Sequence, residues 1–73
     1  MIMKTPETEF VIYMINEIAN RNNLHSSYVY NVLNETGCIK NYLIPFYDVL
    51  HTMGSESVAN EIKEYVRLRG ATL

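Results

Sequence analysis

The sequence has few of the residues that cross-link a chain or mark boundaries within it, namely cysteine, glycine and proline. It contains one cysteine, Cys38, so no disulfide can form within the chain and nothing indicates an oxidising compartment. Three glycines and two prolines occur among 73 residues, and they mark no linker, internal repeat or low-complexity tract. A chain this short builds one modest hydrophobic core, so we predict a single domain over residues 1–73.

Positive charge and long apolar runs are also scarce. Six Lys and Arg stand against eight Asp and Glu, which gives a net charge of −2 and a pI near 5.5. Proteins that bind nucleic-acid backbones usually carry a basic excess, so the charge argues against that class. No apolar run approaches the roughly 18 residues of a membrane span. Met1–Met3 is too short for the core of a signal peptide. We therefore expect a cytoplasmic protein without membrane association.

What the chain does have is helical periodicity between its few glycines and prolines. Thr5-Pro6-Glu7 combines a hydroxyl cap, a proline at the first helical position and an acidic first turn, which is a strong helix start. The spacing that follows predicts a helix from about Pro6 to Asn22, ending in asparagines that tolerate a left-handed exit. Its buried stripe is predicted to be Phe10, Val11, Met14, Ile15 and Ile18.

Serine and glycine mark two further helices. Ser26–Ser27 is predicted to cap a short helix that Gly37 closes. After Gly54, either Ser55 or Ser57 is predicted to cap the last helix, which runs close to the end of the chain. No segment shows sustained period-two alternation, so strands are not expected.

The segment between these helices, Cys38–Met53, contains Pro45. Proline lacks a backbone N–H and collides with the preceding turn, so a kink or a break is expected there. Together the segments predict an all-α fold, a compact bundle of about four short helices with the third kinked or broken near Pro45. The apolar face expected on the third segment consists of Ile39, Leu43, Phe46, Leu50 and Met53.

Few residues suit catalysis or metal binding. His25, Cys38 and His51 are thirteen residues apart each time, which is not the spacing of known zinc sites. Cys38 lacks an adjacent base and orienting group, so small apolar packing is the simpler interpretation. The glycines stand singly and form no phosphate-binding loop. We expect no enzymatic activity, no metal and no cofactor.

Surplus aromatic and apolar side chains are the main functional signal. Six tyrosines occur, and tyrosine suits half-buried interfaces because its ring is apolar and its hydroxyl stays wet. Two tyrosines fall beside or outside the stripes of the first two helices, and a second ridge at i, i+3 and i+7 follows in the third segment. We predict that these five residues bind a protein partner: Tyr13, Tyr30, Ile44, Tyr47 and His51.

Other interpretations stay open. A bend at Pro45 would turn the ridge of Ile44, Tyr47 and His51 into the core. His51 and Thr52 also have a structural interpretation, in which both help to fix the end of a helix. The same ridge would also allow two copies of the chain to pair as a structural homodimer. Asn23–Ile44 loosely matches a helix-turn-helix, although its second helix offers Lys40 and no arginine, so a DNA-binding regulator is a further alternative.

One stretch resembles a known family. Tyr47-Asp48-x-Leu50-His51-Thr52-x-Gly54, followed by Glu61-Ile62-x-Glu64-Tyr65, is similar to short bacterial proteins grouped as domain of unknown function 3791. The likeness covers nearly the whole chain. It implies a gene neighbour resembling an ADP-ribosyltransferase, and hence an antitoxin or accessory subunit. The resemblance supplies no catalytic residues.

Overall fold

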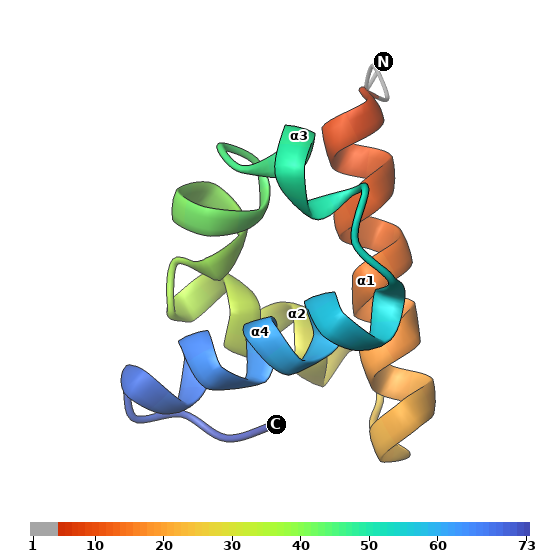
Figure 1. Cartoon of the computed structure of the whole chain (residues 1–73). Coiled ribbons are helices and arrows are strands. Elements are labelled where there is room, and N and C mark those ends of the chain that lie inside the picture. The colour runs from red at the N-terminus through yellow and green to blue at the C-terminus, as the bar shows by residue number, and fades with distance from the viewer. Residues whose placement is uncertain (1–4) are drawn as a thin grey trace.

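Five helices make up the part of the chain that the structure, a computed structural model, describes: residues 5–73 (Figure 1). Residues 1–4, which include the short apolar start considered above, lie outside it. No strand occurs within residues 5–73, which confirms the all-α prediction. The fifth helix arises because the third predicted segment is divided in two. The elements are α1 (Pro6–Asn22), α2 (Ser26–Glu35), the π-helix η1 (Ile39–Leu43), α3 (Tyr47–Leu50) and α4 (Ser55–Leu68).

Helix α1 has the bounds that its local signals predict. The Thr5 side chain accepts a hydrogen bond from the backbone N–H of Thr8 at 3.1 Å, and Pro6 occupies the first helical position. Asn23 ends the helix in the left-handed conformation, with φ of 55°. Both ends of the helix are therefore set by interactions between neighbouring residues, which the sequence alone predicts.

The serine caps predicted for α2 and α4 are wrong. Neither helix has a side-chain hydrogen bond at its N-cap. Instead, Ser26 Oγ donates to Asn16 Oδ1 at 3.1 Å, and Ser55 Oγ accepts from Arg21 Nη2 at 3.2 Å. Each serine thus ties its helix to α1 rather than to its own first turn. The residues at the cap positions are His25 and Gly54.

Pro45 breaks the third segment, as its position predicts. Just before it, the Ile44 N–H donates to the Ile39 carbonyl at 3.1 Å, the wider spacing of a π-turn. The chain resumes helical structure at Tyr47. Because the break changes the phase of the helix, the predicted apolar face is only partly correct. Leu43 and Leu50 are buried, whereas two of its other members are 52% and 36% exposed: Phe46 and Met53.

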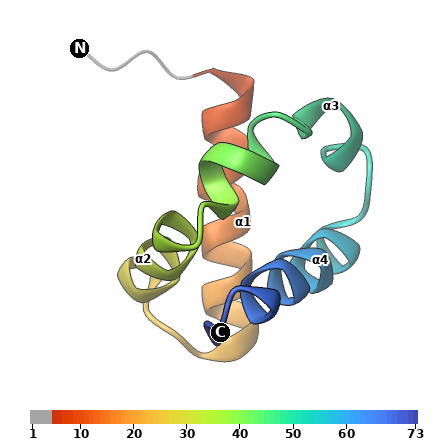
Figure 2. The same cartoon turned by 90° about the vertical axis from the view of Figure 1, so that its left-hand side faces the viewer.

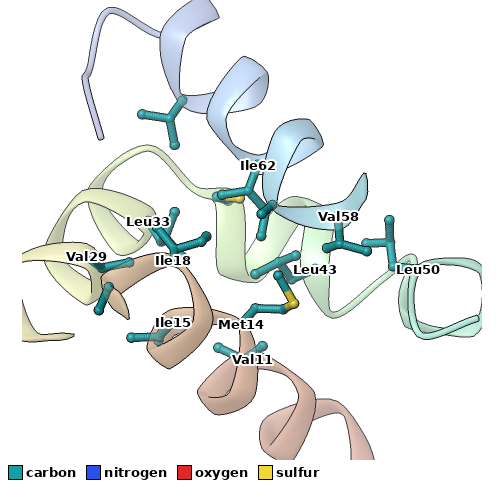
Figure 3. Close-up of a cluster of buried hydrophobic side chains, with 14 residues drawn as sticks. Val11, Met14, Ile15, Ile18, Val29, Leu33, Leu43, Leu50, Val58 and Ile62 are labelled. Atoms are coloured by element: carbon teal, nitrogen blue, oxygen red, sulfur yellow. The ribbon is translucent and has the colours of Figure 1, made fainter. Parts of the chain in front are cut away.

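The core forms around α1, which contacts α2, η1 and α4. Figure 2 shows α1 lying between α2 and α4. Side chains from all five helices converge there (Figure 3), and no polar or charged side chain within residues 5–73 is buried among them. The fully buried residues at the centre include Met14, Ile18, Leu33, Leu43 and Ile62.

Candidate partner-binding surface

The five residues predicted to bind a partner lie at the surface, in two depressions on different sides of α1. Consecutive positions of an α-helix point about 100° apart, so neighbours such as Ile12 and Tyr13 face different directions. Tyr13, Tyr47 and His51 meet in one depression, and Tyr30 and Ile44 meet in the other. The alternative that the ridge turns into the core at Pro45 is therefore wrong for Ile44 and His51, and Tyr47 is half-buried.

The first depression, here called the aromatic hollow, has a volume of about 460 Å³ and is open to solvent. Helix α1 supplies one wall, and α3 lies opposite, beside the N-terminal half of α1 (Figure 1). The break at Pro45 sets α3 off from η1 and allows this approach. The hollow is lined by Pro6, Glu9, Phe10, Tyr13, Tyr47 and His51.

The rings in the aromatic hollow hold one another in place. Phe10 and Tyr47 pack edge to face, with centroids 5.6 Å apart and planes at 71°. Tyr47 stacks on His51 with a centroid distance of 4.4 Å and an angle of 13°. Both arrangements are favourable for aromatic pairs. Tyr13 is 51% exposed at the edge of this group.

His51 ends α3 as well as lining the hollow. Its Nδ1 lies 2.8 Å from the Tyr47 carbonyl oxygen. A carbonyl can only accept, so Nδ1 carries the hydrogen, and Nε2 of the neutral ring is left as an acceptor. Thr52 Oγ1 likewise donates to the Val49 carbonyl at 2.7 Å. The predicted role of both residues in fixing the helix end is confirmed, and in His51 it coexists with exposure to solvent.

The second depression, here called the aliphatic groove, has a volume of about 210 Å³ and no charged residue in its lining. Its most exposed apolar members are Ile12, Tyr30 and Ile44, which are 45%, 47% and 43% exposed. Tyr30 comes from α2, and Ile44 directly follows η1, so three elements meet around the groove. The full lining is Thr8, Val11, Ile12, Ile15, Tyr30, Ile39 and Ile44.

Eight lining residues were not among the five predicted, and three of them matter most for the proposals below: Ile12, Phe10 and Glu9. Ile12 falls outside the buried stripe of α1, so the sequence marks it as surplus apolar surface although it is not one of the five predicted anchors. Phe10 fitted the stripe and was assigned to the core, although it is only partly buried. Glu9 gave no signal, because an acidic residue in the first turn of a helix is ordinary.

Cys38 has the properties of a core residue. It is fully buried, and burial raises the pKa of its thiol from 9.0 to about 12, although Arg69 opposes part of that change. A thiol in this state is a poor nucleophile. The interpretation of Cys38 as an apolar packing residue is confirmed.

Neither a group of metal ligands nor a membrane-spanning helix occurs in the part of the chain that the structure describes. Within residues 5–73, no three His, Cys, Asp or Glu side chains come together as a metal site would require. Over the same residues, no helix has the length and apolar character to cross a bilayer.

Comparison with known proteins identifies a family for this chain. Residues 9–69 match the family described as "Protein of unknown function (DUF3791)". The match takes in α3, nearly all of α1 and most of both depressions. No curated protein and no solved structure matches the chain.

Proposed function

The chain belongs to this family of proteins of unknown function, and from its own surface we propose that it is a non-catalytic protein-interaction module. The observation that carries the proposal is the aliphatic groove, where Ile12, Tyr30 and Ile44 remain half-exposed beside a filled core. Grouped apolar exposure of this kind is typical of interaction sites, whereas single exposed apolar residues are normal.

The distribution of exposed apolar residues supports a protein partner. Residues 5–73 contain nine large hydrophobic residues that are exposed, and four of them lie in the two depressions. Tyrosine is enriched among the residues that dominate binding energy, and both depressions contain it. The partner surface then consists of an uncharged groove and an aromatic hollow on either side of α1.

The family resemblance suggests which partner to test first. We propose an adjacently encoded protein resembling an ADP-ribosyltransferase, met in the cytoplasm, with this chain as its antitoxin or accessory subunit. Binding would mask the active site of the partner or complete its fold, because either outcome buries the apolar side chains that this chain leaves exposed.

The alternative of a DNA-binding regulator receives less support from the geometry. The second helix of the suggested helix-turn-helix is η1, a π-helix of five residues, and Lys40 is its single basic residue. A recognition helix normally offers several side chains along the major groove. A homodimer would use the same two depressions, and the experiment below separates it from partner binding.

The test is co-expression with the product of the adjacent reading frame, followed by size-exclusion chromatography with light scattering. We expect a stable hetero-complex, and we expect Ile44→Ser to weaken it by about tenfold, since truncated interface anchors commonly cost ~1.4 kcal/mol or more. Leu68→Ser is the matched control, because Leu68 is 66% exposed and lines neither depression.

Two outcomes would contradict this function. A dimer that ignores the neighbouring protein would assign the depressions to self-association. Salt-dependent binding of duplex DNA at physiological ionic strength, unchanged by Ile44→Ser, would instead favour the regulator.

A further inference from the structure

The polar groups of the aromatic hollow are mainly acceptors. Glu9, which carries a carboxylate, is part of the lining, and His51 in its neutral form offers the Nε2 lone pair, since its Nδ1–H bonds to the Tyr47 carbonyl. Pro6 has no N–H, and the Glu9 N–H already donates to the Thr5 carbonyl at 3.0 Å. Only the tyrosine hydroxyls can either donate or accept. A ligand rich in hydrogen-bond donors is therefore the chemical complement of this hollow.

Charge and ring faces point in the same direction. Glu9 is the one carboxylate in the lining, and no lysine or arginine is part of it. Aromatic rings carry negative charge on their faces and attract cations placed over them. Tyr13 is half-exposed and takes no part in the two ring pairs, so its ring is the most open of these faces. An anionic ligand would meet both the carboxylate and these faces unfavourably, so a cation is favoured.

We propose that the aromatic hollow is a binding site for the guanidinium group of an arginine side chain of a partner protein. The biological setting of this site rests on the interaction function proposed above, but the binding chemistry belongs to the isolated chain. The hollow is shallow and open, with a volume of about 460 Å³, so the head group of one side chain can lie against its lining.

Arginine suits the hollow better than lysine does. A guanidinium is planar, stacks on aromatic faces and offers five donors to the acceptors of the hollow. The ammonium of lysine is compact and strongly hydrated, and it lacks the flat face. The protein already contains one such contact, since the guanidinium carbon of Arg69 lies 3.4 Å from the centroid of the Tyr65 ring.

The site can be tested on the full chain without its partner. The probe is N-acetyl-arginine N-methylamide, titrated while backbone and aromatic ring signals are followed by NMR. We expect saturable shifts centred on Phe10, Tyr13, Tyr47 and His51. The matched citrulline derivative has nearly the same shape without charge, and we expect it to produce no saturable shift. An equal response to citrulline would overturn the cation site, and an equal response to the lysine derivative would overturn the choice of guanidinium.

Substitutions in the first turns of α1 test whether the probe binds in the aromatic hollow. Glu9→Gln is expected to weaken arginine binding about threefold, because an exposed charge pair contributes little more than that. Glu7→Gln is the matched control, since it removes the same charge from the same turn but lies outside the hollow. Tyr13→Leu keeps an apolar side chain and removes a ring face, and it is expected to weaken binding by about two- to fivefold.

The variants also define how the assignment fails. Equal weakening by Glu7→Gln and Glu9→Gln would mean that the probe responds only to overall charge, and it would overturn the site. A partner that binds while arginine does not would overturn the site and leave the interaction function intact. Arginine binding without any complex in co-expression would overturn the interaction function and leave the arginine site intact.

Discussion

At the scale of single residues, Cys38 shows how burial changes chemistry without creating function. Its side chain packs among apolar residues, and burial favours the neutral thiol over the thiolate. The consequence is a dependence of stability on pH, because the unfolded chain exposes the same thiol to water.

We predict that the folded state loses stability as the pH rises above 9. Below pH 9 the thiol is protonated in both states, so the contribution is fully present. Between pH 9 and 12 the unfolded thiol ionises while the folded one, with a pKa of about 12, does not. Stability therefore falls with rising pH, by about 1 kcal/mol between pH 8 and pH 10.

Urea unfolding at pH 8 and pH 10, compared between the natural chain and Cys38→Ala, checks this prediction. Ionisation of the other tyrosines affects both proteins alike, whereas the pKa of Tyr42, which is raised mainly by burial and in smaller part by Cys38, is changed slightly by the substitution. The cavity left by alanine costs the same at either pH. The natural chain is expected to lose more stability than the variant does. Equal losses would show that Cys38 ionises as readily in the folded state as in the unfolded one.

At the scale of elements, the join between α2 and η1 depends on Gly37. Its φ of +78° lies in the left-handed region, and a Cβ built there would come within 2.7 Å of the Asn41 side-chain nitrogen. Glycine adopts this conformation freely, whereas other residues are strained in it. The turn therefore requires glycine mainly for its backbone conformation, and an added Cβ would also displace the end of the exposed Asn41 side chain.

We predict that Gly37→Ala destabilises the fold by about 2 kcal/mol, of which the backbone conformation accounts for about 1–2 kcal/mol. Gly70→Ala is the matched control, because Gly70 has a φ of +82° but no atom within 4 Å of the added Cβ. Thermal unfolding followed by circular dichroism measures both variants. If Gly70→Ala costs as much as Gly37→Ala, then crowding by Asn41 plays no part.

At the scale of the whole molecule, α1 contributes both to the core and to the proposed binding surface. Its buried face contacts three other helices, while its outer flanks line both depressions. A 73-residue domain has a total stability of about 4–11 kcal/mol, so a single core substitution removes a large part of it.

Two isoleucines of α1 make this division measurable. We predict that Ile18→Ala costs about 2–5 kcal/mol, since Ile18 is fully buried. Ile12→Ala, at a site 45% exposed, is expected to cost less than about 1 kcal/mol and to act instead on partner binding. Urea unfolding of both variants, with partner binding measured for Ile12→Ala, provides the check. Similar losses of stability would place Ile12 in the core and remove it from the binding surface.

Sequence patterns predicted those features that depend on neighbouring residues. The bounds of α1, the left-handed Asn23, the closure of α2 at Gly37 and the break at Pro45 all follow from interactions within about one helical turn. The core stripe of α1 follows from periodicity in the same way, except that Phe10 is only partly buried. Patterns failed where a side chain binds outside its own turn, as Ser26 and Ser55 do when they bond to α1.

The sequence by itself therefore determined that the chain is all-α, at which residues several of its helices end or break, and which aromatic and aliphatic residues exceed the needs of its core. Only the tertiary structure decided that five of them separate into two depressions, and that Phe10 and Glu9 join Tyr13, Tyr47 and His51. The physical reason is that the approach of α3 to α1 depends on the path of the chain through η1 and the Pro45 break. That path depends on the packing of the whole core, which local sequence patterns do not predict.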